Sequence, residues 1–247
     1  MQSSVSSVSS SVPPSSPLII SVEGNIGAGK STLLHYLQKK VTEIVMKSYS
    51  KKMNVLQEPV DVWNTVCDEN NQNILTKYYE DPEKYSFPFQ ILAYTTRLSL
   101  IQNELNKKES DVIVCERSLD ADKNIFAKML FDDNKIEYIN YQIYNRLYQD
   151  TAITANCIIY LDTTPDICMK RIQKRNRTGE DKIQIEYLAK CKQYYDDWLI
   201  HNNAYGIPVL HINVDEEIDY NDKNLHENND NIKKIIRFIV YHSMTSG

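Results

Sequence analysis

A phosphate-binding pattern lies near the N-terminal end of the chain. Gly24 and Gly29 are separated by four residues and are followed by Lys30 and Ser31, which is the complete spacing of a P-loop. In such a loop the glycines let backbone N–H groups turn towards a phosphate, the lysine reaches the β- and γ-phosphates, and the serine hydroxyl serves Mg²⁺. The expected triphosphate-binding residues are Gly24, Asn25, Ile26, Gly27, Ala28, Gly29, Lys30, Ser31 and Thr32.

Two carboxylates follow short apolar runs. Glu58 comes after the run 53–56, and Glu116 comes directly after the run 112–115. Because ligands of open α/β sheets bind beyond the carboxyl ends of the strands, these positions are candidates for chemistry rather than solvated loop residues. Glu58 is suited to accept a proton from a substrate hydroxyl, and Glu116 to hold Mg²⁺ through water. Arg117 is suited to steady the transferred phosphoryl group or to pair with a carboxylate.

A cluster of basic residues occurs later in the chain. Arg171, Lys174, Arg175 and Arg177 fall within seven residues, and Arg171 and Arg175 share a helix face. The simple explanation is a solvated basic surface. In an acidic protein that carries a P-loop, we favour a lid whose arginines close over the transferred phosphate.

A third set of polar residues has helical spacing. Gln90, Ala93 and Arg97 share one face of an expected helix, and Asp122 and Phe126 lie one turn apart on another. Together they are suited to read a flat heterocycle by hydrogen bonds and stacking. Individually they are equally consistent with surface polar residues and a core phenylalanine.

The elements that must position these residues alternate along the chain. Short apolar runs predict strands at 18–22, 53–56, 112–115, 157–161 and 208–212, and the helical patterns follow the glycine loop at 33–41 and then cover 89–105, 121–129, 138–149, 187–199 and 232–239. Alternating strands and helices predict an α/β P-loop NTPase-type three-layer fold, with a parallel five-stranded sheet and helices on both faces. The Asn-rich segments 68–73 and 221–231 are expected to be loops. We expect one domain, 18–247, after a flexible Ser-rich leader, 1–17.

Composition narrows the function further. The formal net charge is −5 without a long basic stripe, which argues against a polymeric nucleic acid partner. No apolar run approaches the roughly 20 residues that span a bilayer, so no membrane partner is expected. The five cysteines have no metal-ligand spacing, and Cys115 and Cys157 are expected to be buried. A leader without Lys or Arg and unpaired thiols favour the cytoplasm.

Several longer motifs, in this order, resemble those of the deoxyribonucleoside kinase family, especially the deoxycytidine and deoxyguanosine kinases. The resemblance extends from about residue 18 to the C-terminal helix. The matching stretches are EGNIGAGKST (23–32), EPVDVW (58–63), YEDPEKYSFPFQ (79–90), ERSLDAD (116–122), RIQKRNRTGE (171–180) and EYL (186–188).

The resemblance implies a role for each matching residue. Glu58 would be the general base on the 5′-hydroxyl, Arg117 would hold the base and the reacting oxygen, and Glu116 would serve magnesium. The substrate-binding residues implied are Trp63, Tyr79, Gln90, Phe126 and Glu180, with Tyr79 and Glu180 on the sugar 3′-hydroxyl. Arg171, Arg175 and Arg177 match lid arginines, although Asn176 departs from the smaller residue of some relatives. The family further implies ATP as donor (another nucleoside triphosphate is possible), Mg²⁺ and a homodimer.

The same resemblance bears on specificity. Ala93, Arg97 and Asp122 match the branch of the family that handles cytosine or purines. An Arg–Asp pair at the far end of the pocket would obstruct the thymine methyl group, so we expect thymidine to be a poor substrate. Tyr78 is bulkier than the residue expected there, which bears on the size of the pocket.

Two other functions share the P-loop. A nucleoside monophosphate kinase of the thymidylate kinase type usually has Asp-Arg where this chain has Glu116-Arg117, and Glu58 would repel an acceptor phosphate. A non-catalytic nucleotide-binding subunit would not need Lys30, Glu58 and the lid arginines together. Both alternatives are less consistent with this sequence than a deoxynucleoside kinase.

Overall fold

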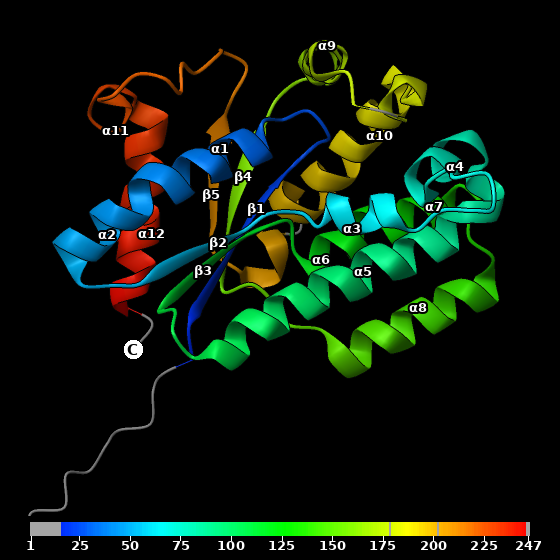
Figure 1. Cartoon of the computed structure of the whole chain (residues 1–247), viewed down its shortest axis with the longest axis horizontal. Coiled ribbons are helices and arrows are strands. Elements are labelled where there is room, and N and C mark those ends of the chain that lie inside the picture. The colour runs from blue at the N-terminus through cyan, green and yellow to red at the C-terminus, as the bar shows by residue number, and fades with distance from the viewer. Residues whose placement is uncertain (1–15, 178, 202, 246–247) are drawn as a thin grey trace, which may run out of the picture.

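Five parallel strands form a single sheet in the computed structural model, which describes residues 16–177, 179–201 and 203–245. The strands are β1 (Leu18–Gly24), β2 (Met53–Leu56), β3 (Val112–Glu116), β4 (Cys157–Asp162) and β5 (Val209–Asn213), in the spatial order β2-β3-β1-β4-β5 (Figure 1). The predicted parallel five-stranded sheet is confirmed. Of the predicted leader, 1–17, all but the last two residues lie outside the described ranges.

Helices cover the sheet on both sides. They are α1 (Lys30–Tyr36), α2 (Thr42–Tyr49), α3 (Val60–Thr65), α4 (Ile74–Glu80), α5 (Pro82–Lys107), α6 (Leu119–Ala121), α7 (Lys128–Asp132), α8 (Tyr138–Thr151), α9 (Pro165–Arg175), α10 (Ile185–Asp196), α11 (Leu225–Asn228) and α12 (Asp230–Thr245). Helical turns of π type extend or join some of them at Leu37–Val41, Asp122–Ala127 and Asp197–His201, and 3-10 turns occur at Glu180–Lys182 and Asn203–Gly206.

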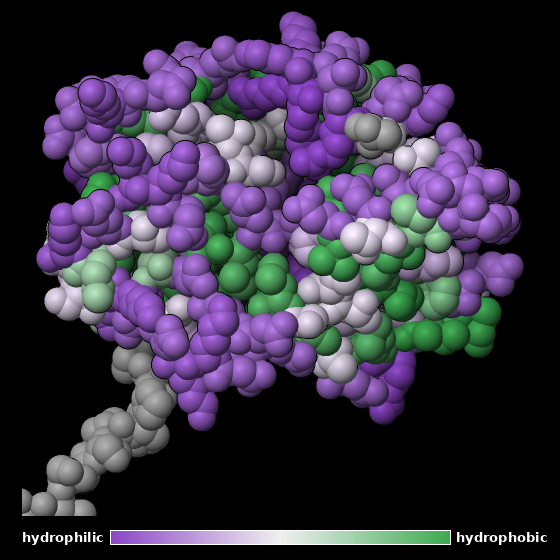
Figure 2. All heavy atoms as spheres, in the orientation of Figure 1, coloured by the Kyte–Doolittle hydropathy of each residue, from purple (hydrophilic) through white to green (hydrophobic). Residues whose placement is uncertain are grey.

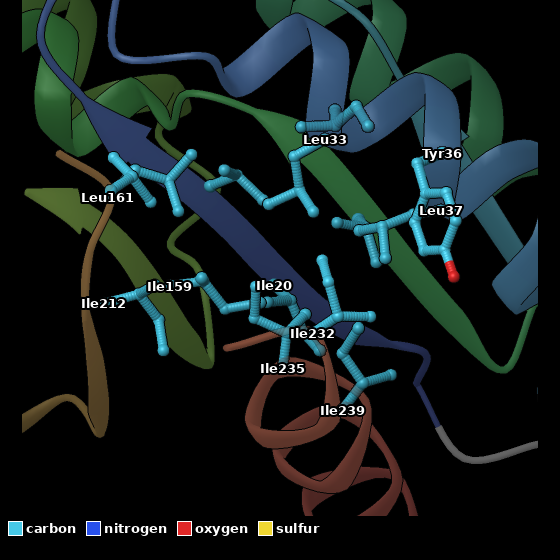
Figure 3. Packing of buried hydrophobic residues seen from close by; sticks show 14 of the residues in the cluster. Ile20, Leu33, Tyr36, Leu37, Ile159, Leu161, Ile212, Ile232, Ile235 and Ile239 are labelled. Atoms are coloured by element: carbon cyan, nitrogen blue, oxygen red, sulfur yellow. The ribbon is translucent and has the colours of Figure 1, made fainter. Parts of the chain in front are cut away.

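Alternate residues of the strands face opposite helical layers, because side chains alternate across a strand. Ile20 and Ile159 face the layer of α1 and α12, where they join Leu33 and Ile235 in the largest buried cluster (Figure 3). Ile113 faces the other layer and packs with Ile101 of α5. On that same side α10 packs on β4, and α8 lies outside α5 through Tyr94 and Tyr144. The expected three-layer arrangement is therefore confirmed.

Helix α5 begins seven residues before the predicted start at Phe89. Asp81 caps it by accepting a hydrogen bond from the Lys84 N–H at 3.3 Å, and Pro82 takes the first helical position. Pro88 lies inside the helix, where it removes one backbone donor. That proline is why the apolar pattern indicated a later start.

Four helices were absent from the sequence prediction as separate elements: α2, which continues the predicted helix 33–41, and α3, α4 and α11. Of α9, the prediction contained only the helix face shared by Arg171 and Arg175. The segment 221–231, predicted to be a loop, contains the short α11 and the first residues of α12, so that prediction was wrong there. These helices are short or polar, and the 3.6-residue apolar period is weak over so few turns. The segment 68–73 is a turn without helix, closed by a bridge between Cys67 and Asn73.

Within 16–177, 179–201 and 203–245, no helix is both long and apolar enough to cross a membrane. The described residues also contain no cluster of three or more His, Cys, Asp or Glu side chains suited to a metal ion. Cys115 and Cys157 are buried as predicted, as are Cys168 and Cys191, and all five cysteines are free thiols.

Candidate active site

The P-loop connects the end of β1 to the start of α1. Gly24 and Gly27 have φ values of +146° and +82°, a region that side chains with a Cβ rarely adopt. A Cβ on Gly24 would lie 2.6 Å from the Leu161 carbonyl oxygen, and one on Gly27 would lie 2.6 Å from that of Cys168. The loop therefore passes so close to the backbone of β4 and α9 that glycine is needed at both positions.

Lys30 is the first residue of α1 and is buried in the loop. Its Nζ donates to the carbonyl oxygens of Gly24 at 3.1 Å and Asn25 at 2.9 Å. Burial and the nearby Arg117 lower the pKa of Lys30 to about 8, although the carboxylates around the site partly offset them. A buried ammonium group held only by neutral carbonyls is well prepared to receive a phosphate anion.

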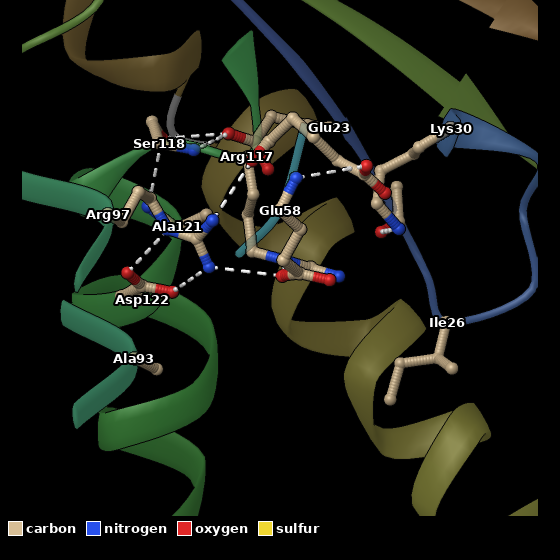
Figure 4. A network of polar contacts seen from close by, with 12 residues as sticks. Glu23, Ile26, Lys30, Glu58, Ala93, Arg97, Arg117, Ser118, Ala121 and Asp122 are labelled. Carbon is tan, nitrogen blue, oxygen red and sulfur yellow. Dashed lines mark hydrogen bonds and ion pairs between the residues drawn. The ribbon is translucent and has the colours of Figure 1, made fainter. Parts of the chain in front are cut away.

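Glu58 lies between two guanidinium groups (Figure 4). Its Oε1 accepts from Arg97 Nη2 at 3.1 Å and from Arg117 Nε at 3.3 Å. Burial alone would raise the pKa of Glu58, but the positive charges of Arg117, Arg97 and Lys30 outweigh burial and lower the pKa to about 2. Among the described residues no hydrogen bond reaches the second oxygen, Oε2, so one oxygen is anchored and the other remains available as an acceptor.

Arg97 and Asp122 form a buried, two-point ion pair. Arg97 donates from Nε to Asp122 Oδ2 at 2.9 Å and from Nη2 to Oδ1 at 3.2 Å. The same Nη2 reaches Glu58, and Nη1 donates to the Glu116 carbonyl oxygen at 3.0 Å. Arg97 therefore connects Asp122 directly to Glu58, and both Arg97 and Asp122 line the pocket. Their expected position at the far end of the pocket stays a prediction.

Ser31 and Glu116 meet at the mouth of the P-loop. Ser31 Oγ donates to Glu116 Oε1 at 2.7 Å, and Glu116 Oε2 accepts from the Glu58 N–H at 3.3 Å. A hydroxyl and a carboxylate are hard oxygen ligands, the kind that Mg²⁺ binds alongside waters and substrate phosphates. These two side chains therefore fit magnesium, whose other ligands would be waters and substrate phosphates.

The P-loop opens into a pocket that also contains the expected nucleoside-binding residues. Gln90, Ala93 and Arg97 line it from α5, as their helical spacing predicted. Its other expected lining residues are Glu58, Trp63, Tyr79, Arg117, Asp122, Phe126 and Glu180. Aromatic packing holds one wall of the pocket in place. The ring of Phe89 meets that of Trp63 edge to face with 5.3 Å between centroids, and it stacks on the ring of Tyr78 with 4.9 Å between centroids. The bulky Tyr78 lines this pocket, and its hydroxyl lies 3.1 Å from that of Tyr187.

The arginine-rich segment divides into two parts. Arg175 makes a bidentate ion pair with Glu180, with distances of 2.6 and 2.7 Å from Nη2, and Arg177 approaches the same carboxylate at 3.4 Å. Both arginines line the main pocket. Arg171 does not: it donates to the Val214 carbonyl oxygen at 2.7 Å and lines a second pocket that also borders the P-loop and includes Arg175. Thr178, within the predicted lid, lies outside the described residues.

Sequence reasoning assigned no role to Glu23, Tyr195 or Tyr187. Glu23 and Tyr195 bond to one another and to the turn at Arg117, although they are far apart in sequence. Glu23 lies in the buried strand β1, immediately before the first glycine of the P-loop. The sequence signal for a role of Glu23 was the presence of a charged residue in an otherwise apolar strand.

A parallel sheet with a P-loop, a carboxylate between two arginines and an adjoining aromatic pocket defines a P-loop phosphotransferase. Comparison with known proteins narrows this class. The family model for deoxynucleoside kinase matches residues 20–239, so the chain belongs to the deoxynucleoside kinase family. It is a kinase of nucleotide salvage, and the family implies ATP as its phosphate donor.

Individual relatives agree with the family match. A probable deoxycytidine kinase of fowlpox virus (strain NVSL) is 38% identical over 202 residues, covering 79% of this chain and 78% of the relative. Human deoxycytidine kinase is 33% identical over 225 residues, covering 83% and 85%. The mitochondrial deoxyguanosine kinase of Xenopus laevis is 30% identical over 244 residues, covering 88% and 89%. These matches favour the deoxynucleoside kinase over both alternative functions.

Proposed function

We propose that this kinase phosphorylates the 5′-hydroxyl of a purine deoxynucleoside or deoxycytidine in preference to thymidine. The observation that carries this proposal is the Asp122 carboxylate in the wall of the pocket. Arg97 bonds each of its oxygens once, which leaves lone pairs to accept a hydrogen bond from a base. An exocyclic amino group of cytosine or adenine donates to such an acceptor. Thymine offers a carbonyl oxygen and a methyl group instead.

Glu58 is the proposed general base. In the proposed step, the 5′-oxygen forms a bond to the γ-phosphorus, the bond between that phosphorus and the β–γ bridging oxygen breaks, and the hydroxyl proton passes to Glu58 Oε2. The low pKa keeps Glu58 ionised, so it is always ready to orient the hydroxyl, while its weak basicity implies that the proton moves late in the transfer. Lys30 and Arg117 would stabilise the charge that develops on the phosphoryl group and the reacting oxygen.

The rest of the pocket would orient the nucleoside. We propose that Gln90 hydrogen-bonds the base, while Phe126 and Trp63 bound it with their rings. The proposed contacts to the sugar 3′-hydroxyl come from Tyr79 and Glu180. Burial raises the pKa of Tyr79 well above its usual value, so its hydroxyl keeps its proton and can donate to the sugar.

On the donor side we propose that residues 24–32 bind the ATP phosphates and that Ser31 and Glu116 hold Mg²⁺. When bound, the ion neutralises charge on the β- and γ-phosphates. Arg175 and Arg177 line the pocket beside Lys30, which supports a role on the transferred phosphate. Arg171 lines the second pocket together with Gly27 and Ala28, which supports a role towards the remainder of the donor.

We further propose a homodimer through α8. Tyr138, Ile139 and Ile143 are 69%, 62% and 51% exposed, and the two isoleucines share a face by their i, i+4 spacing. Figure 2 shows hydrophobic surface along α8, at the lower right. Pairing two copies through this face would bury these side chains. A cytoplasmic location stays a prediction, which the free thiols support.

The substrate proposal is tested by measuring kcat/KM for the four natural deoxynucleosides with saturating ATP and Mg²⁺. We expect deoxycytidine or a purine deoxynucleoside to exceed thymidine by about 10-fold or more, since leaving one buried acceptor unpaired costs ~1–3 kcal/mol. Thymidine as the best substrate would contradict the proposal. The corresponding 5′-monophosphates serve as controls, because a better rate with them would favour a monophosphate kinase.

A further inference from the structure

Glu23 is a buried carboxylate that the proposed transfer step does not use. It lies in β1 just before the P-loop, and its side chain accepts three hydrogen bonds, of which those from Ser118 are drawn in Figure 4. Oε1 accepts from the Ser118 N–H at 2.8 Å and from Ser118 Oγ at 2.7 Å, and Oε2 accepts from Tyr195 Oη at 3.3 Å. All three donors come from segments that also hold Arg117.

The directions of these bonds define the state of Glu23. Ser118 Oγ accepts from the Ala121 N–H at 3.1 Å, which leaves its proton for Glu23. Tyr195 Oη accepts from Arg117 Nη1 at 2.6 Å, which likewise leaves the tyrosine proton for Glu23. Burial raises the pKa of Tyr195, so this proton is retained. Burial raises the pKa of Glu23, while Arg117 and the Ser118 hydrogen bonds act in the opposite direction. Both carboxylate oxygens act as acceptors in this arrangement, which is the pattern of an ionised Glu23.

Arg117 needs support because its backbone is strained. Its φ is +69°, in the left-handed region that a long side chain enters at a cost of about 1 kcal/mol or more. The Arg117 N–H bonds to the Val22 carbonyl oxygen at 3.1 Å, and the next residue, Ser118, bonds to Glu23. β1 thus clamps both sides of the turn that presents Arg117.

Two arginines contact Glu58, and each of them is also connected to a second carboxylate. Arg97 contacts Glu58 and has a second carboxylate, Asp122, of its own. Arg117 contacts the same oxygen of Glu58, and its second carboxylate is Glu23, reached through the Tyr195 hydroxyl. When Glu58 takes a proton it loses its charge, and each arginine then depends on its second carboxylate.

We propose that Glu23 is a positioning residue for Arg117. Through Tyr195 and Ser118 it holds the guanidinium group in place while Glu58 accepts the substrate proton. This inference rests on the proposed roles of Glu58 and Arg117. It adds Glu23, on β1, as a residue that positions Arg117.

The test compares Glu23→Gln with the wild-type kinase, using ATP and the best deoxynucleoside. The amide keeps the shape and can still accept from Ser118, but it lacks the charge. We expect kcat to fall about 10-fold, per folded enzyme, with KM for ATP changed less than 2-fold. Glu104→Gln is the matched control: Glu104 is also buried, at 3% exposed against 0% for Glu23, pairs with Lys107 at 2.8 Å and lies outside the pocket. It should lose stability but not kcat.

A double-mutant cycle separates positioning from stability. In an Arg117→Ala background, measured by single turnover at high enzyme concentration, Glu23→Gln should change the rate less than 2-fold. A further 10-fold loss in that background, or an unchanged kcat in the single variant, would overturn the inference. Failure of the proposed function itself is recognised separately, because the wild-type protein would then phosphorylate no deoxynucleoside.

Discussion

Lys30 connects the structure of the P-loop to the binding of its expected ligand. Its ammonium group is buried, held by two carbonyl oxygens, and has a pKa of about 8, so a large part of it is neutral at mildly alkaline pH. A polyphosphate anion favours the charged form and raises this pKa. Binding of the triphosphate must therefore be coupled to protonation of Lys30.

We predict proton uptake on ATP binding between pH 8 and 9, amounting to roughly half a proton per site at pH 8. Protons are taken up because Lys30 is partly neutral in the free protein and fully charged beside the bound triphosphate. The affinity for ATP therefore falls as the pH rises through 8. Calorimetric titration in two buffers of different ionisation enthalpy measures the uptake. Lys30→Ala should abolish it, and equal binding enthalpies in both buffers for the wild-type protein would be the contrary result.

At the level of residues, the sequence identified the side chains that carry family motifs, but not those that support them. The sequence pointed to four of these side chains: Glu58, Arg97, Arg117 and Asp122. In the structure both arginines donate to Oε1 of Glu58, and Arg97 also donates to Asp122. Tyr195 was not found, because its hydroxyl bonds to groups 78 and 172 residues away. Local spacing carries no information on contacts of that range.

Among the secondary-structure elements, the strands were the most predictable. The central strands β1, β3 and β4 are short apolar runs that are buried almost throughout, whereas the edge strands β2 and β5 are only partly buried. Short length, β-branched residues and flanking turn residues indicate such strands in a sequence. Helix α4 was missed because its seven residues contain three polar ones, Thr76, Lys77 and Glu80, and follow an Asn-rich turn, with Asn73 as the cap. The sequence indicated helix α9 only through the helix face that Arg171 and Arg175 share. Its packing against Gly27 of the P-loop became visible only in three dimensions.

The packing of α9 against the P-loop predicts that alanine substitutions at two glycines of the loop differ in their effect on stability. Gly27 and Gly29 both have positive φ, at +82° and +97°, but a Cβ on Gly27 would meet the Cys168 carbonyl of α9 at 2.6 Å, whereas nothing lies within 4 Å of one on Gly29. Gly27→Ala should therefore lose about 1–3 kcal/mol more unfolding free energy than Gly29→Ala, because overpacking adds to the shared backbone strain. Urea unfolding without nucleotide measures the difference, and equal losses would show that α9 moves freely away from the loop.

For the whole molecule, the two sides of the sheet have different tasks. The layer of α1 and α12 forms the largest core, while α5 and α10 on the other side combine packing with the walls of the pocket. Helix α8 lies outside α5 and presents an apolar face that the described part of the chain leaves exposed. No residue of α8 lines the main pocket, so we expect assembly through α8 and chemistry to be separable.

We predict that Ile139→Glu combined with Ile143→Glu converts a dimer into a monomer, because two charges would be placed in an apolar contact. Light scattering after size-exclusion chromatography measures the mass. Met46→Glu on α2 is the control, since Met46 is 53% exposed but lies on the side of the molecule away from α8 (Figure 1). A wild-type protein that is monomeric at all concentrations would refute the dimer.

The central claim is that Glu58, held by two arginines, accepts the proton of the 5′-hydroxyl. The most direct test is the rate of phosphoryl transfer in a single turnover by the wild-type protein and by Glu58→Gln, together with the ATP affinity of both. We predict that the variant binds ATP within a few-fold of the wild-type affinity but transfers the phosphoryl group ~100-fold more slowly or worse, which is the usual contribution of a general base. A transfer rate close to that of the wild-type protein would contradict this account.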